Sequence, residues 1–195
     1  MTTAGWEQWL VWQAPLLVLT AIGTHLVMSA SQTLLHRWVG HRSWGGRFFH
    51  NHIDFHHHLY ARGHLTSVAY RGEEGNNTPF FLIPTLLVAG GLFFVMPLGL
   101  FLAMALAATV SFRAHVYFDK VYHVAGSPLE RFGWFRRKQR LHFVHHLHAN
   151  SNFAVIDFFW DRLLGTYRAP DDAPATDPAR ALAARAGAED AGGRS

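Results

Sequence analysis

The sequence predicts an all-α integral membrane protein in which helices cross the bilayer and carry a polar, helical cytoplasmic cap. Two observations predict this class. Half of the 195 residues are apolar, and they collect in long runs instead of alternating with polar residues. The 17 Lys and Arg residues avoid these runs, because none of them lies in residues 1–35 or 79–112.

The two apolar runs predict about three transmembrane helices, with a fourth left open. The first run predicts a crossing at about residues 9–35, which is long enough to span a bilayer with some tilt. The second run breaks at Met96-Pro97-Leu98-Gly99, and this break predicts a helical hairpin with crossings at 79–96 and 98–113. Both ends of a hairpin emerge on the same side of the membrane.

The basic residues predict which side that is. Five of them lie in residues 36–78 and twelve lie from Arg113 onward. The positive-inside bias therefore places 36–78 and 113–168 in the cytoplasm. The charge then serves topology and contact with lipid headgroups, and we expect no nucleic-acid partner. The 15 Arg against 2 Lys indicate a GC-rich bacterial genome, hence a multi-pass protein of the bacterial inner membrane. Residues 1–168 form the predicted domain, and 169–195 a disordered tail.

Histidine is the residue type that points to chemistry, since the absence of Cys excludes disulfides, iron–sulfur clusters and cysteine nucleophiles. Fourteen of the 15 histidines fall in the predicted cytoplasmic segments. Most of them form three boxes: the first, HxxxxH, is His36 and His41, the second, HxxxHH, is His52, His56 and His57, and the last, HxxHH, is His142, His145 and His146. Neutral imidazole is a common ligand of iron, zinc and copper. Eight or more histidines exceed what one ion needs, so the sequence predicts a site for two metal ions.

The spacing inside each box predicts which rings point together. Positions i, i+3 and i+4 of a regular helix share a face, so we expect the three rings of the last box to converge. In the second box we expect His52 and His56 to converge, with His57 turned about 100° aside toward a neighbouring ion. The two rings of the first box lie about 140° apart on a regular helix, and a break at Gly40 is expected to let them converge.

The boxes, with an apolar hairpin between the second and the last, resemble those of integral-membrane diiron oxygenases and desaturases. After the last box come an Asn (Asn150 or Asn152) and the stretch WDRLLGTY from Trp160 to Tyr167. This ending is similar to the W-D-x-x-F-G-T of the fatty acid hydroxylase/sterol desaturase superfamily. The segment His123-Val-Ala-Gly-Ser-Pro resembles a histidine–glycine–proline element of its sterol-modifying members. The resemblance covers about residues 32–168.

The resemblance also implies a set of site residues. The implied metal ligands are His36, His41, His52, His56, His57, His123, His142, His145 and His146, with His115 as a further candidate. No other catalytic residue is expected. Asp119, Asp161 and Asn152 are the expected outer partners that orient ligating rings. We expect the remaining histidines of the cap to lie behind the ligands or on the surface: His50, His58, His64 and His148.

The function implied is O₂-dependent hydroxylation of an unactivated C–H bond in a lipid from the bilayer, carried out by two non-haem iron ions with O₂ as co-substrate. Amino-acid side chains cannot perform this chemistry without a redox metal. The chain has no flavin or nicotinamide fingerprint, so an external ferredoxin or cytochrome would supply electrons, with Arg136–Arg140 either as its docking site or as a headgroup contact.

Other functions share parts of this pattern. Acyl-lipid desaturases and carotenoid-ring hydroxylases use the same kind of boxes. A His-rich membrane protein that binds or transports metal is the alternative from another class. A transporter places ionisable residues inside its crossings, whereas residues 79–112 contain none.

Overall fold

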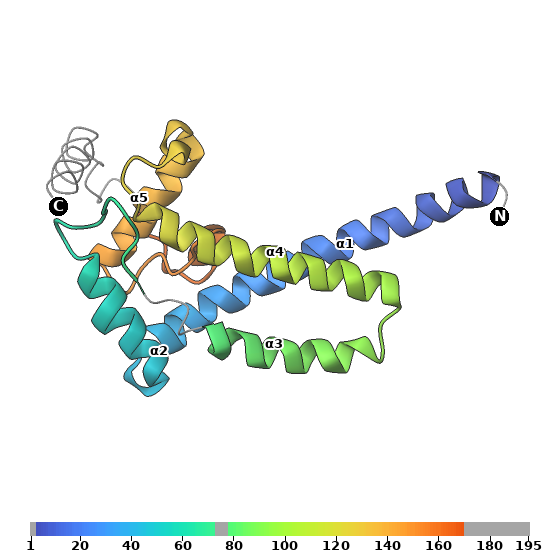
Figure 1. Ribbon diagram of the computed structural model, residues 1–195, viewed down its shortest axis with the longest axis horizontal. Coiled ribbons are helices and arrows are strands. Elements are labelled where there is room, and N and C mark those ends of the chain that lie inside the picture. Colours follow the sequence, from blue (N-terminus) through green and yellow to red (C-terminus); the bar gives the residue numbers. More distant parts are fainter. Residues whose placement is uncertain (1–2, 73–77, 170–195) are drawn as a thin grey trace, which may run out of the picture.

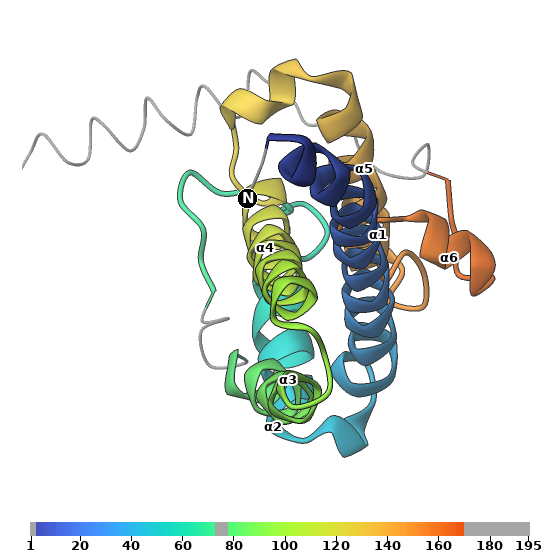
Figure 2. The ribbon, with the colours of Figure 1, turned by 90° about the vertical axis from the view of Figure 1, so that its right-hand side faces the viewer.

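The computed structural model describes residues 3–72 and 78–169, and the regular elements within these ranges are helices. The first, α1 (Thr3–Leu35), continues directly into η1 (His36–Gly40). A hairpin follows, made of α3 (Thr78–Phe93) and α4 (Leu98–Tyr122). α4 packs along α1 and also contacts α3, so the three long helices extend in the same direction away from the cap (Figures 1 and 2).

The long helices carry their apolar side chains outward. Two segments, Gln13–Gly40 and Leu98–Tyr122, are long and apolar enough to cross a membrane, and only 6% of an apolar 18-residue stretch in each is buried within the protein. Leu19, Leu87 and Leu106 are each more than 60% exposed. Core helices of a soluble protein bury such residues, so these surfaces suit the hydrocarbon of a bilayer. The predicted class, a helical membrane protein, is confirmed.

The boundaries of the hairpin follow the proline that the sequence singled out. α3 ends at Phe93, and Pro97 immediately precedes α4, where its fixed φ suits a helix start. α4 continues past the predicted end at 113 as far as Tyr122. With 16 residues, α3 is about 24 Å long, against about 30 Å of hydrocarbon. The number of crossings therefore stays a prediction, and the predicted tail beyond residue 169 lies outside the described ranges.

Short helices form a cap at the end of α1 and α4 opposite the hairpin loop (Figure 1). Its elements are η1, η2 (Ser43–Gly45), α2 (Arg47–Phe49), η3 (His50–His57), η5 (Pro128–Arg131), α5 (Gly133–Leu147) and α6 (Phe159–Leu163). Tyr122, Phe135 and Val155 form an apolar cluster that joins α4, α5 and the segment before α6. This cluster fixes α5 against the end of α4, and both of these helices carry histidines.

Candidate metal centre

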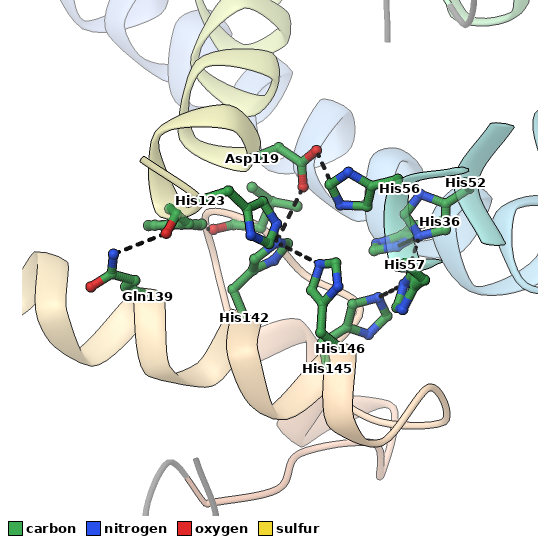
Figure 3. A network of polar contacts seen from close by, with 12 residues as sticks. His36, His52, His56, His57, Asp119, His123, Gln139, His142, His145 and His146 are labelled. Carbon is green, nitrogen blue, oxygen red and sulfur yellow. Dashed lines mark hydrogen bonds and ion pairs between the residues drawn. The ribbon is translucent and has the colours of Figure 1, made fainter. Parts of the chain in front are cut away.

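Nine of the ten histidines predicted to bind metal come together in the cap, in two groups. Figure 3 labels all of them except His41. Within each group the candidate ligand atoms all lie within 4.8 Å of one another. The five-histidine group consists of His36, His41, His52, His57 and His145. The four-histidine group consists of His56, His123, His142 and His146. All four members of the second group are buried, and His41 and His57 are the two partly exposed members of the first.

Two π-helical turns decide how the first and second boxes are divided. η1 and η3 are both π-helices, in which hydrogen bonds run from i to i+5 and bring residues five apart together. Consequently His52 and His57 both enter the five-histidine group, with 3.2 Å between their Nε2 atoms, while His56 enters the other group. The expectation that His52 and His56 converge and His57 turns aside was wrong, because it assumed a regular α-helix.

The same turn geometry brings the first box together, and the helix ends at Gly40, the residue where a break was expected. Nε2 of both His36 and His41 reaches Nε2 of His52, at 2.7 and 3.1 Å. Gly40 ends η1 and leaves room for this approach, because a Cβ there would lie 3.3 Å from Cδ2 of His36 and 3.1 Å from Cε1 of Phe48. A side chain at residue 40 would therefore push on the rings of the site.

The last box lies on a regular helix, α5, yet its three rings serve two groups. His142 and His146, four residues apart, share a face and belong to the four-histidine group, with 3.2 Å between their Nε2 atoms. His145 points into the five-histidine group, where its Nε2 lies 3.2 Å from that of His41. The prediction that all three rings converge on one place was thus wrong in detail. α5 instead contributes rings to both groups.

His123 is placed by the end of α4. It is the residue after the helix, and the segment 65–67 pairs beside it through a parallel bridge between Ser67 and Val124. Nδ1 of His123 lies 2.7 Å from the carbonyl oxygen of Leu65, and the ring of Tyr60 stacks on it with 3.9 Å between centroids. Nε2 is left to face His142 at 3.0 Å.

The hydrogen bonds at Nδ1 show which ring nitrogens carry the proton and which carry a free lone pair. Nδ1 of His36, His123 and His145 donates to the carbonyl oxygens of Phe153, Leu65 and Ser151, at 2.5, 2.7 and 2.7 Å. A neutral imidazole has one N–H, so the Nε2 of each of these rings carries a lone pair. Lone pairs that face one another at about 3 Å repel unless a proton or a metal ion lies between them. The arrangement fits a metal ion in each group.

Burial keeps the rings in the form that binds metal. Burial, reinforced by neighbouring rings, holds the pKa well below the usual 6.5 for seven of them, namely His41, His52, His56, His57, His142, His145 and His146. Burial also lowers the pKa of His123 to about 4, against the opposing effect of its hydrogen bond to Leu65. Neutral imidazole is the metal-binding form, and it suits iron, zinc, copper and nickel.

We expected Asp161 and Asn152 to contact ligating rings. Instead they hold the backbone segment whose carbonyl groups contact those rings. The Asp161 carboxylate is fully buried and accepts hydrogen bonds from the N–H of Phe153 and Ala154, at 2.7 and 3.0 Å. Asn152 adopts φ 52°, and its side chain binds the carbonyl oxygen of Leu141 and the backbone of Arg168. These contacts fix the segment 151–153, whose carbonyls hold His145 and His36.

The other predicted residues lie as follows. Asp119 on α4 faces the Nε2 side of the four-histidine group, not the back of a ring (Figure 3). His115 belongs to neither group. His50 pairs with Asp54 at 2.6 Å on the exposed side of η3, and His58, His64 and His148 are also outside both groups, as expected.

Some groups that contact the ligating rings were not predicted from the sequence. The carbonyls of Leu65, Ser151 and Phe153 have no signature in the sequence, because every residue carries one. Tyr60 had a signal, since it follows His56 by four residues and so shares its face.

Comparison with protein families agrees with the motifs. The model of the family described as "Fatty acid hydroxylase" matches residues 18–166, a range that includes all nine grouped histidines and most of WDRLLGTY. Comparisons with curated proteins and with solved structures give no match. The chain therefore belongs to the fatty acid hydroxylase family, an oxidoreductase type, as the last box and WDRLLGTY predicted.

Proposed function

We propose that this protein hydroxylates an unactivated C–H bond of a membrane lipid with O₂, at a centre of two non-haem iron ions. The observation that carries the proposal is the pair of buried histidine groups in a chain of this family. The overall reaction is R–H + O₂ + 2 e⁻ + 2 H⁺ → R–OH + H₂O. Two bound irons would supply the redox chemistry that reduces O₂ and attacks the C–H bond.

The protein's own part is to hold the ions and keep water away. The two groups supply five and four neutral nitrogens, and a neutral shell leaves the site cationic, which favours binding of a reduced oxygen species. The carbonyls of Leu65, Ser151 and Phe153 keep three rings from rotating. The stacked ring of Tyr60, which is 1% exposed, covers His123 from one side.

The lipid would approach along the long helices. α1 ends directly before His36 and α4 ends directly before His123, so the apolar surface of both helices leads to the two groups. A chain leaving the bilayer along this surface needs no exposure to water. The family supports lipid oxidation.

The electron donor would dock on the outer face of α5. Arg136 and Arg137 are exposed there, and the inner face of the same helix carries the last box. Arg137 precedes His142 by five residues, about 8 Å along the helix. An acidic ferredoxin or cytochrome would thus come close to the metal ligands. We further propose that the cap faces the cytoplasm of a bacterium and that the helices lie in its inner membrane.

The test combines metal analysis with lipid analysis of cells that express the full chain. We expect about two irons per purified chain, and a lipid that gains 16 mass units only in cells with the gene. His145→Ala should abolish this product, while His50→Ala, outside both groups, should not. A product lighter by two mass units would show that the enzyme desaturates the lipid instead of hydroxylating it. Exchangeable zinc without O₂ consumption would refute the oxygenase and favour a metal-binding protein.

A further inference from the structure

Asp119 presents its carboxylate to the metal side of the four-histidine group. Its side chain, which is 12% exposed, projects from α4 toward His56 and His142 (Figure 3). Oδ1 lies 3.6 Å from Nε2 of His142, and Oδ2 lies 4.0 Å from Nε2 of His56. Both distances are too long for hydrogen bonds. The backbone acceptors that orient rings from behind contact Nδ1 instead, at 2.5–2.7 Å.

The distances match those between two ligands of one ion. Donor atoms about 2.1 Å from a metal are separated by about 3.0 Å when they are at right angles and about 4.2 Å when they are opposite. The Nε2 atoms of this group, at 3.0 Å for His142–His123 and 3.2 Å for His146–His142, agree with ligands close to right angles. Each oxygen of Asp119 lies at such a distance from one ring, Oδ1 from His142 and Oδ2 from His56, although Asp119 is not among the side chains whose ligand atoms all lie within 4.8 Å of one another.

We propose that Asp119 is a metal ligand, so that the two ions differ: one is held by five imidazoles and the other by four imidazoles and one carboxylate. This inference rests on the proposed two-metal centre. The carboxylate brings a negative charge and a hard oxygen donor to one ion only. Iron(II), which is bound by mixed sets of imidazole and carboxylate ligands, should then be held more tightly at this position than four imidazoles alone would hold it.

A thiol substitution detects coordination directly, because the chain contains no Cys. Asp119→Cys protein, purified full-length and loaded with Co²⁺, should show a thiolate-to-cobalt charge-transfer absorption that the wild type lacks. Ser111→Cys is the matched control: it places an equally buried thiol on the same helix, about 12 Å away along the axis, and should show no such band. Absence of the band in Asp119→Cys protein that holds two Co²⁺ would overturn the assignment.

A second variant keeps the proposal testable if the thiol form does not fold. Asp119→Asn should weaken the binding of one of two Co²⁺ ions at least about 100-fold, beyond the 10–100-fold typical of an outer partner, and leave the other unchanged. Two ions bound as in the wild type would refute it. Wild-type protein that binds two ions but oxidises no lipid would refute the proposed function alone. Wild-type protein that binds no metal would refute both.

Discussion

The WDRLLGTY stretch contains the residue whose replacement tests the architecture of the metal centre most directly. The carboxylate of Asp161 accepts hydrogen bonds from Phe153, Ala154 and Thr166, and none of these partners is a histidine. Phe153 in turn holds His36 through its carbonyl. We predict that Asp161→Asn disturbs the five-histidine group through the backbone of residues 153 and 154.

The loss of stability expected for Asp161→Asn follows from the hydrogen bonds that the two carboxylate oxygens accept. Oδ1 accepts from Phe153 N–H and Thr166 Oγ1, both at 2.7 Å, and Oδ2 accepts from Ala154 N–H at 3.0 Å. Asparagine can keep Oδ1 in place, but its amide group then faces the Ala154 N–H, and one buried donor loses its acceptor. This costs about 2–3 kcal/mol. For a chain of this size the unfolding midpoint should fall by roughly 4–12 °C.

The assay is the thermal midpoint of the metal-free protein in detergent, at one heating rate, together with metal affinity. Loss of an outer partner typically weakens metal binding about 10–100-fold, and here the five-histidine group should lose its ion first. Thr166→Val provides a graded comparison, since it removes one of the three hydrogen bonds and should cost about 1 kcal/mol. An Asp161→Asn protein with wild-type midpoint and wild-type metal affinity would show that the carboxylate does not position the site.

Three further predictions concern the backbone and the rings. Gly40→Ala should lower the metal content of the protein, because the added Cβ would press on His36 and Phe48. Gly23→Ala is the control, since a Cβ there would have no neighbour within 4 Å, and its metal content should not change. Metal analysis of the two purified variants checks this. Asn152→Ala should lower the free energy of unfolding by roughly 3–5 kcal/mol, because alanine tolerates the positive φ poorly and makes none of the side-chain hydrogen bonds. Asn152→Gly should lower it by about 1 kcal/mol less, because glycine adopts this φ without strain. Equal losses for the two variants in chemical unfolding would contradict this argument. The metal-free protein should lose stability as the pH falls from about 6.5 to 4, because the unfolded chain binds more protons there. The His123 ring, with its pKa near 4, accounts for about 3 kcal/mol of this loss, and midpoints that do not change over this pH range would refute it.

Local pattern was enough to predict the helices and the ligand candidates. The apolar runs predict α1, α3 and α4 because each run is longer than a turn or loop and contains no charge to interrupt it. Pro97 marks the start of α4 because proline is accommodated where a helix begins. The three boxes supply eight of the nine grouped histidines, and the segment that begins at His123 supplies the ninth, whereas His115 lies outside both groups.

The division of those histidines between two groups was decided by tertiary structure. A sequence pattern assumes 3.6 residues per turn, whereas η1 and η3 are π-helical. His57 and His56 therefore exchanged places relative to the prediction, and His145 separated from its two neighbours on α5.

The sequence by itself determined the fold class, the family and the histidines available as ligands, since these depend on composition and on residues close together in the chain. Only the folded chain decided that Phe153, 117 residues from His36, holds its ring, that Asp161 secures Phe153, and that Asp119 faces the metal side of its group. The physical reason is that backbone carbonyls and the direction of a carboxylate leave no mark in the sequence. In WDRLLGTY, the aspartate that identified the family is the residue that fixes the backbone behind the metal site.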